Sequence, residues 1–253
     1  MNANVQSAMF REQQSSESDE SVLSGQPVNR SDLVQVPGGA ALRTHLMPLQ
    51  QWLDEPDVTE ISVNGAREIW IAKQGQPYME RHEAEELTHE VLLELAQQVA
   101  TSTEQEVSKE KPLLSAELPN GYRIQFVLPP AAGRNVVLSI RKPAVLNLSL
   151  DDYDKAGAFT LTNQISMLER ETENTLRTGY ANREYGRFLR IAVKMRKNIL
   201  ISAGTDTGKT TLLNAMLKEI PEHERLVIIE DARELRPPQT NVVRLFYSRG
   251  EQG

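Results

Sequence analysis

The sequence of 253 residues contains no cysteine. A disulfide framework is therefore excluded, and the composition is compatible with a reducing compartment. No apolar run approaches the roughly 20 residues that a helix needs to cross a bilayer. The first residues, MNANVQSAMFREQQSSESDES, lack the charged start and the apolar core of a signal peptide. We therefore expect a cytoplasmic protein whose association with a membrane, if it occurs, is peripheral.

The sequence also lacks an excess of positive charge and a recognisable metal-binding cluster. The formal net charge is -7 at pH 7, which argues against nonspecific nucleic-acid binding through a basic face. We expect no direct specific nucleic-acid binding. His82, His89 and His223 have no metal-ligand spacing and no neighbouring cysteine. The only metal ion that the sequence leads us to expect is one bound together with a nucleotide.

A phosphate-binding loop is predicted by residues 202–211, which read SAGTDTGKTT. The apolar run from Asn198 to Ser202 before it is typical of a buried parallel strand. After it, apolar residues recur at helical spacing until Pro221 ends the pattern. Strand, glycine-containing turn and helix then follow in the order that points backbone N–H groups at a phosphate.

Each residue type in this loop has a chemical role, and the expected ligands are ATP and Mg²⁺. Lys209 would reach the β- and γ-phosphates, and the Thr210 hydroxyl would bind the magnesium ion that bridges phosphate oxygens. Lys209 is thus a candidate catalytic residue and Thr210 a candidate metal ligand. The residues expected to bind nucleotide are Ala203, Gly204, Thr205, Asp206, Thr207, Gly208, Lys209, Thr210 and Thr211.

Two positions depart from the strict loop pattern. Ala203 stands where the pattern begins with glycine, which is a small change. Asp206 occupies a place where glycine would let the backbone approach the phosphates, and it adds a carboxylate near them. If this side chain points into solvent the cost is small, whereas if it points inward, like-charge repulsion weakens nucleotide binding.

A second buried strand is predicted at Leu226 to Ile229, and it is followed by Glu230 and Asp231. In open α/β sheets the ligand site lies beyond the carboxyl ends of the parallel strands. Glu230 and Asp231 are therefore candidate catalytic residues that would orient the attacking water or hold magnesium through its water shell. The alternative is that these acids cap the next turn and stay solvated.

The run from Asn198 to Leu245 resembles the traffic ATPases of bacterial type IV secretion systems, which belong to the secretion ATPase family. The resemblance rests on SAGTDTGKTTLLNAMLKEIP, ERLVIIEDARELRPP and NVVRLFY. Upstream, LSAELPNGYRIQFVLPP and LSIRKP resemble the N-terminal domain of the same family. The similarity therefore covers about residues 40 to 250.

This resemblance implies a hexameric ring with ATP bound between an N-terminal α+β domain and a RecA-like α/β domain. It also implies partners among the inner-membrane components of a secretion system and a location at the cytoplasmic side of that membrane. Arg123 and Arg141 match the family's nucleotide-contacting arginines, and a planar guanidinium suits phosphate oxygens. The alternative for Arg123 is the exposed side of a strand whose other side is buried.

The expected organisation has four parts. Residues 1–35 are a polar tail of disordered composition, residues 36–146 form the α+β domain, and residues 147–183 form a linker with one helix. Residues 184–253 form a partial RecA-like P-loop NTPase domain. Gly179 is expected to cap the linker helix at its C-terminus, and the long linker would allow domain exchange between protomers.

Within the N-terminal domain, alternating apolar residues predict strands at 57–64 and 68–73, joined as a hairpin at Asn64-Gly65. Helical periodicity predicts a helix over 85–100. Two further strands are expected at 122–128 and 135–140, on either side of the Pro129-Pro130 pair. A second amphipathic helix is expected at 184–196.

The family pattern continues beyond NVVRLFY into a Walker B strand and a histidine-containing box, neither of which the sequence contains. We therefore expect an incomplete RecA-like domain that binds ATP better than it turns it over. The favoured function is an ATPase subunit that powers type IV secretion. The alternatives are a type II secretion or type IV pilus motor ATPase, and a truncated non-catalytic homologue that caps a ring of complete subunits.

Overall fold

The computed structural model describes residues 39–143, 149–155, 157–160 and 167–247. The predicted tail at 1–35 lies outside these ranges. The chain forms two compact units, and both draw on distant parts of the sequence. Among the described residues, the first unit takes 39–143, Leu226–Ala232 and 241–247, and the second takes the rest up to Arg225 together with Arg233–Thr240. The domain boundaries at 146 and 184 stay a prediction.

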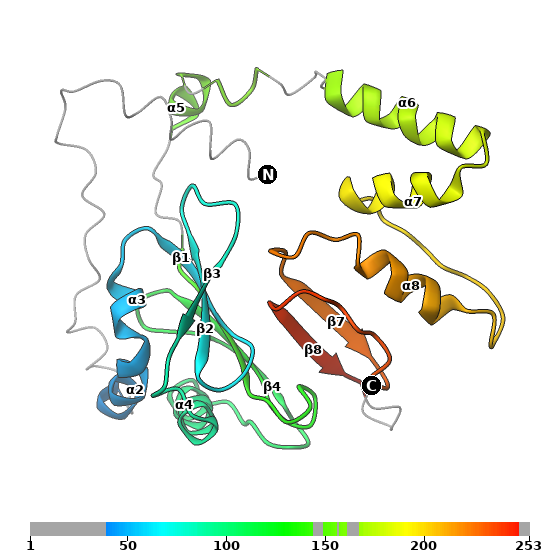
Figure 1. The fold of residues 1–253 in the computed structure, drawn as a ribbon. Coiled ribbons are helices and arrows are strands. Elements are labelled where there is room, and N and C mark those ends of the chain that lie inside the picture. The colour runs from blue at the N-terminus through cyan, green and yellow to red at the C-terminus, as the bar shows by residue number, and fades with distance from the viewer. Residues whose placement is uncertain (1–38, 144–148, 156, 161–166, 248–253) are drawn as a thin grey trace. The chain divides into compact units, whose positions relative to one another are not determined.

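The first unit is built on an antiparallel sheet (Figure 1). Its six strands have the order β3-β2-β1-β6-β5-β4. Every neighbouring pair in this order runs antiparallel. The strands are β1 (Val58–Val63), β2 (Glu68–Lys73), β3 (Glu80–Glu83), β4 (Leu113–Glu117), β5 (Arg123–Val127) and β6 (Val137–Arg141).

The predicted hairpin is confirmed as β1 and β2, in which Ile61 lies opposite Ile71. Both side chains are fully buried, because alternate residues of a strand point to the same face and that face is covered. The strands expected at 122–128 and 135–140 are confirmed as β5 and β6. Sequence patterns therefore identified the strands that contribute most to the core.

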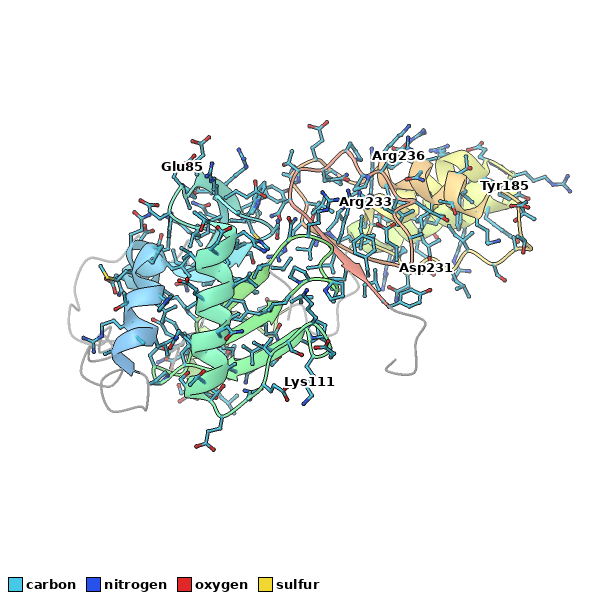
Figure 2. The ribbon with its side chains drawn as sticks, turned by 90° about the horizontal axis from the view of Figure 1, so that it is seen from below. Glu85, Lys111, Tyr185, Asp231, Arg233 and Arg236 are labelled. Atoms are coloured by element: carbon cyan, nitrogen blue, oxygen red, sulfur yellow. The ribbon has the colours of Figure 1, made fainter. Side chains whose placement is uncertain are left out.

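Helices cover one face of this sheet. They are α2 (Gly39–Leu46), the 3₁₀ helix η3 (Met47–Leu49), α3 (Gln50–Asp54) and α4 (His89–Ser102). Figure 2 shows α2 and α4 side by side, with Glu85 before α4 and Lys111 after it. The helix predicted from residue 85 begins at His89, because the Thr88 hydroxyl caps it by accepting a hydrogen bond from the Val91 amide.

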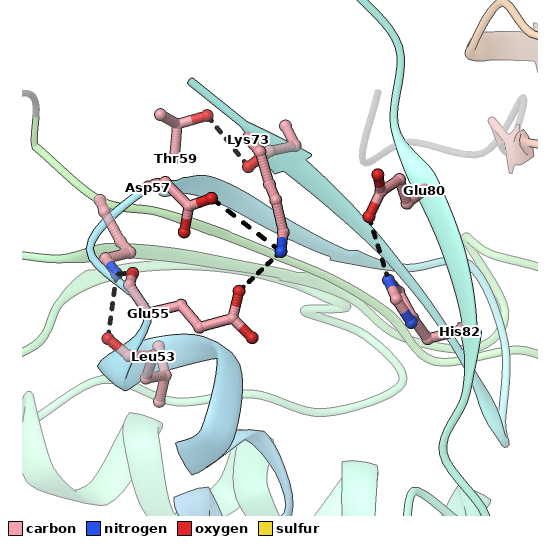
Figure 3. Close-up of polar contacts among 9 residues, drawn as sticks. Leu53, Glu55, Asp57, Thr59, Lys73, Glu80 and His82 are labelled. Atoms are coloured by element: carbon pink, nitrogen blue, oxygen red, sulfur yellow. Dashed lines mark hydrogen bonds and ion pairs between the residues drawn. The ribbon is translucent and has the colours of Figure 1, made fainter. Parts of the chain in front are cut away.

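Two lysines tie the end of α3 to the sheet, and Figure 3 shows the first of them, Lys73, beside Glu55 and Asp57. Lys73 lies 2.8 Å from a Glu55 carboxylate oxygen, and this hydrogen bond raises the pKa of the lysine. Lys142 donates to the carbonyl oxygens of Leu53 at 3.0 Å and of Glu55, while burial lowers the pKa of its ammonium group. The second lysine thus satisfies carbonyls at the C-terminus of α3 that have no partner within the helix.

The first unit also contains a two-stranded parallel ribbon formed by β7 (Leu226–Glu230) and β8 (Val242–Phe246). The strand predicted at 226–229 is thereby confirmed. Val243 of the ribbon packs with Ala132 and Val137. The buried Asn241 side chain accepts a hydrogen bond of 2.8 Å from the Asn64 side chain. An apolar contact and a buried amide pair therefore fix β8 against the six-stranded part of this unit.

The second unit is helical in its described part. Its helices are α5 (Leu150–Lys155), α6 (Met167–Ala181), α7 (Tyr185–Lys194) and α8 (Lys209–Leu217). α6 and α7 form a helical hairpin (Figure 1), in which the rings of Tyr180 and Phe188 lie 5.9 Å apart. The helix predicted at 184–196 is confirmed as α7.

The expected C-cap at Gly179 is wrong, because this glycine lies inside α6. The Glu184 amide donates to the Gly179 carbonyl, and Arg183 is the residue with a positive φ of 60°. The chain reverses there. A Cβ added at Gly179 would lie 3.7 Å from the Phe188 Cβ, which is an ordinary van der Waals distance. The left-handed residue that ends a helix is usually glycine, and here an arginine fills that role.

The strand expected at Asn198 to Ser202 is not formed. These residues have no regular secondary structure, and Leu200 is 92% exposed. An apolar run becomes a strand only where a neighbouring strand satisfies its backbone groups. In the described part of the chain, β7 pairs with β8 and neither pairs with this run.

Candidate phosphate-binding site

The predicted phosphate loop leads directly into α8, which begins at Lys209. Gly208 occupies the N-cap position with φ 88°, a left-handed conformation that glycine adopts without steric cost. The Thr207 hydroxyl donates to the Gly204 carbonyl at 2.8 Å and closes the turn. The amides of the first turn of α8 have no acceptor within the helix, so they are available to an anion.

Lys209 and Thr210 are the first two residues of α8, and both side chains take part in the local geometry. The Lys209 ammonium group donates to the Gly204 carbonyl oxygen, so it lies over the loop. The Thr210 hydroxyl donates to a carboxylate oxygen of Glu234 at 3.0 Å. A cation and a carboxylate therefore lie at the N-terminal end of this helix.

Glu234 belongs to an extended segment that we call the strap, Arg233–Thr240. Asn214, in the middle of α8, donates to the Glu234 carbonyl at 3.2 Å and accepts from the Arg236 amide at 2.7 Å. Further along, the Gln239 side chain donates to the carbonyls of Leu217 and Ile220, at 3.1 and 2.7 Å. The strap thus runs along α8 from its first turn to its last.

Sequence reasoning missed Glu234 as a site residue. It lies only four residues after Glu230. The one indication in the sequence was therefore that Glu234 is a third carboxylate close to Glu230 and Asp231. What brings it to Thr210 is the path of the strap along α8, and hydrophobic periodicity carries no information on that path. Asn214 and Gln239 were missed for the same reason.

Asp206 has a positive φ of 57° and is exposed. This left-handed conformation costs an ordinary L-residue about 1–2 kcal/mol, although aspartate tolerates it better than most residues. The position therefore has the backbone geometry of a glycine in the phosphate loop.

We expect Asp206→Gly to tighten nucleotide binding by about 1 kcal/mol, because it removes one partly screened carboxylate near the phosphates and suits the left-handed backbone. Isothermal titration with a nonhydrolysable ATP analogue measures the effect. Asp206→Asn is the matched variant, since asparagine tolerates the same φ and removes only the charge. Unchanged or weaker binding in both variants would show that the carboxylate points away from the ligand.

The predicted acids Glu230 and Asp231 lie at the end of β7, in the first unit. The Glu230 side chain is 6% exposed and lies 2.7 Å from the guanidinium of Arg244 on β8. Asp231 is exposed. The Glu230 carboxylate thus has a structural partner in the ribbon, and the catalytic roles of both acids stay a prediction.

The predicted pair Arg123 and Arg141 is brought together. These residues lie directly opposite each other on β5 and β6, and both are exposed. Neither guanidinium has a hydrogen bond or ion pair with any residue of the described ranges. Like charges directly opposite on neighbouring strands repel, so a bound anion would stabilise this arrangement. The prediction that Ile124 and Phe126, on the other side of β5, are buried is confirmed.

An open groove of about 480 Å³ lies beside Arg123. It borders the edge strand β4, where the Gln105 side chain donates to the Ser115 carbonyl at 3.0 Å. Glu117, directly opposite Arg123 on β4, also lines it. Of the arginine pair, Arg123 lines this groove. Its lining residues are Thr103, Gln105, Ser115, Ala116, Glu117, Arg123, Ile124 and Gln125.

Within the described ranges, no three histidine, aspartate or glutamate side chains gather as a set that could hold a metal ion. No helix of the described part has the length and apolar character that spanning a bilayer requires. At the start of α8, the Thr210 hydroxyl and a Glu234 carboxylate oxygen lie 3.0 Å apart. Hydroxyl and carboxylate oxygens are the hard ligands that Mg²⁺ prefers, so these two residues fit a nucleotide-bound magnesium ion.

Comparison with known proteins points to one family. A family model described as type II/IV secretion system protein matches residues 43–252. The type IV secretion system protein VirB11 of Bartonella quintana is 36% identical over 226 residues, and that of Brucella suis is 37% identical over 227 residues. These alignments cover 85% and 87% of this chain, and 63% and 62% of the relatives.

A solved structure agrees with these matches. The crystal structure of the VirB11 ATPase from the Brucella suis type IV secretion system, in complex with sulphate, matches with a TM-score of 0.76 at 36% identity. The match covers 82% of this chain and 64% of that one, so the chain spans less than two thirds of the relatives. The fold is thereby shown to be a mixed α/β fold with a sheet. The chain belongs to the type II/IV secretion system protein family.

Proposed function

We propose that the chain binds Mg²⁺-ATP at the loop Ala203–Thr211 and acts as an ATPase subunit of a type IV secretion system. The observation that carries this proposal is the arrangement at the start of α8. There, Lys209 lies over the loop, and Thr210 is hydrogen-bonded to Glu234. A cation, free helix amides and a hydroxyl–carboxylate pair are the groups that a nucleotide triphosphate with its metal ion requires.

In this proposal the loop amides and the Lys209 ammonium group bind the phosphates. Lys209 is the only positively charged side chain in the loop, so it carries the charge complementarity. Gly208 keeps the N-terminus of α8 open, since it has no side chain between the first-turn amides and a ligand. These features are all local to α8 and its preceding turn.

Thr210 and Glu234 would hold the magnesium ion, with the hydroxyl as a direct ligand and the carboxylate on a metal-bound water. The ion supplies charge neutralisation of the phosphate oxygens when it is bound. Glu234 would then fix the Thr210 hydroxyl in the orientation that presents its lone pair to the metal, because the hydroxyl proton is donated to the carboxylate.

Arg123 and Arg141 would contribute positive charge from the six-stranded part, in agreement with their opposed, unpaired guanidinium groups. Glu230 and Asp231 are proposed to act near the phosphates through water. Glu230 also pairs with Arg244 on β8, so its proposed role would have to be compatible with this ion pair. A RecA-like arrangement of residues 184–253 is part of the same proposal.

The assembly and location follow from the family. We propose a homo-oligomer, most simply a hexamer, that works with inner-membrane components of the secretion system from the cytoplasmic side. Similarity to proteins described as type IV secretion system proteins supports the type IV system over a type II or pilus motor. Light scattering of the purified chain, with and without nucleotide, would test the assembly directly.

The magnesium site can be tested with Glu234→Gln. We define the magnesium gain as the ratio of the dissociation constants for a nonhydrolysable ATP analogue in EDTA and in Mg²⁺. The substitution should reduce this gain about tenfold, because it removes a charged acceptor worth roughly 1.5–3 kcal/mol. Isothermal titration gives both constants without any need for turnover.

The matched control is Glu222→Gln, which removes a carboxylate from an exposed position after α8. It should leave the magnesium gain unchanged. If Glu234→Gln also leaves the gain unchanged, Glu234 has no part in the metal site. If the parent chain binds no nucleotide in either buffer, the proposed function is wrong as a whole.

A further inference from the structure

The strap contacts the phosphate loop through the Glu234 carboxylate, and the main chain that follows the Glu234 Cα is held by the Asn214 side chain. Asn214 donates its amide N–H to the carbonyl of Glu234 and accepts the amide N–H of Arg236 through its side-chain oxygen. These two hydrogen bonds use the nitrogen and the oxygen of the same side-chain carboxamide. In this way Asn214 pairs with the strap as the backbone of a neighbouring strand would.

The position of Asn214 on α8 explains why it meets the strap next to Thr210. Residues four apart on a helix lie on the same face, one turn from each other. Thr210 and Asn214 are four apart, so the hydroxyl that binds the Glu234 carboxylate and the carboxamide that binds the Glu234 carbonyl lie in one line. Glu234 is therefore held at two points, by its main chain and by its carboxylate.

We propose that Asn214 is a positioning residue for the proposed nucleotide site, and that it acts by fixing the Glu234 carboxylate at the Thr210 hydroxyl. This inference rests on the proposed function, since it assigns a role to that site. The Asn214 bonds hold the main chain at the Glu234 carbonyl itself, so their loss would release the backbone that carries this carboxylate. A glutamate side chain has several rotatable bonds, so a fixed main chain limits the positions that its carboxylate can take.

The Gln239 contacts at the other end of the strap can be compared with those of Asn214. Gln239 is buried and donates to two carbonyls at the end of α8, Leu217 and Ile220. It anchors the same segment to the same helix, but it does so away from Glu234. A general loosening of the strap is therefore separable from a loss of positioning at Thr210.

The experiment measures the magnesium gain, as defined above, for four variants of the full chain. Asn214→Ala removes both bonds, and the isosteric Asn214→Asp keeps the acceptor for Arg236 but removes the donor to the Glu234 carbonyl. Both should lower the magnesium gain about as much as Glu234→Gln does, roughly tenfold, and leave the affinity in EDTA unchanged. Gln239→Leu should lower the thermal midpoint and leave the gain unchanged.

A double variant decides whether Asn214 acts through Glu234. If it does, the double variant Asn214→Ala with Glu234→Gln should lose no more magnesium gain than either single variant, within about twofold. If the two residues act independently, the fold-losses of the two single variants should multiply. Multiplying losses would overturn the proposal. So would an unchanged gain in both Asn214 variants, or an equal loss of affinity in EDTA and in Mg²⁺, which would indicate a structural role only.

Two further results separate this proposal from the function on which it rests. If the parent chain shows a magnesium gain and Glu234→Gln keeps it, the positioning role fails while nucleotide binding stands. If the parent chain binds no nucleotide, both fail together.

Discussion

Replacing Lys209 with alanine is expected to remove measurable nucleotide binding from the chain. The substitution deletes the only positive charge of the loop and the ammonium group that lies on the Gly204 carbonyl. A charge-assisted contact to phosphate contributes about 1.5–3 kcal/mol, or roughly 10- to 100-fold in affinity, for each such bond. Isothermal titration with a nonhydrolysable ATP analogue measures the loss.

Lys218→Ala provides the control for this experiment. Lys218 lies at the C-terminal end of the same helix and is exposed. Its removal should leave the affinity unchanged, and circular dichroism should show that both variants retain the helical content of the parent. An unchanged affinity in a folded Lys209→Ala variant would exclude the loop from nucleotide binding.

The largest effect on stability is expected from Phe126→Ala in β5. Phe126 is 1% exposed and lies between Leu114 on β4 and Leu138 on β6. Truncating a buried phenylalanine leaves a cavity that the surrounding side chains fill only in part, at a cost of about 3–5 kcal/mol. Urea unfolding followed by tryptophan fluorescence measures this cost.

The tryptophans suit this measurement because both of them, Trp52 and Trp70, are buried in the first unit. Gln125→Ala is the matched control, since Gln125 is the exposed neighbour of Phe126 and points to the other face of β5. It should change the free energy of unfolding by less than about 0.5 kcal/mol. A loss below about 1 kcal/mol for Phe126→Ala would mean that the core around β5 collapses into the space.

Patterns that repeat along the chain predicted the local elements well. The alternation that placed Ile61 and Ile71 inward fixed the hairpin of β1 and β2, and the apolar run before Glu230 gave β7. The helix expected after the phosphate loop, from apolar residues at helical spacing, is α8. In each case the pattern of consecutive residues shows which face or strand is buried. The prediction therefore does not depend on a partner elsewhere in the chain.

The expectations that failed depended on partners elsewhere in the chain. The run at Asn198 to Ser202 has the composition of a strand. A strand also needs a neighbouring strand to pair with, and composition does not show whether one is present. β4 was not predicted because its residues, LLSAE, alternate weakly. Gly179 was interpreted from its preference for helix ends, whereas it lies within α6 and the left-handed residue that follows this helix is Arg183.

The residues of the candidate site were also predicted only in part. The loop residues could be named because glycine, lysine and threonine stand at fixed spacing within one segment. Glu234 could not be named, since its place at Thr210 depends on hydrogen bonds from Asn214, which lies 20 residues earlier. Contacts between an irregular segment and a helix leave no periodic trace in the sequence.

The interleaving of the two units limits how the protein can be divided. The chain passes between them after Asn147, after Arg225, after Ala232 and after Thr240. A single protease cut in the long segment at 147–183 would therefore place the six-stranded sheet on one fragment, while the β7–β8 ribbon would stay covalently joined to the second unit by the three remaining crossings. A chimaera that exchanges the second unit with that of a relative would have to carry two separate segments, Leu148–Arg225 and Arg233–Thr240. Evolution could exchange these parts only together, because the helix and its strap would otherwise come from different parents.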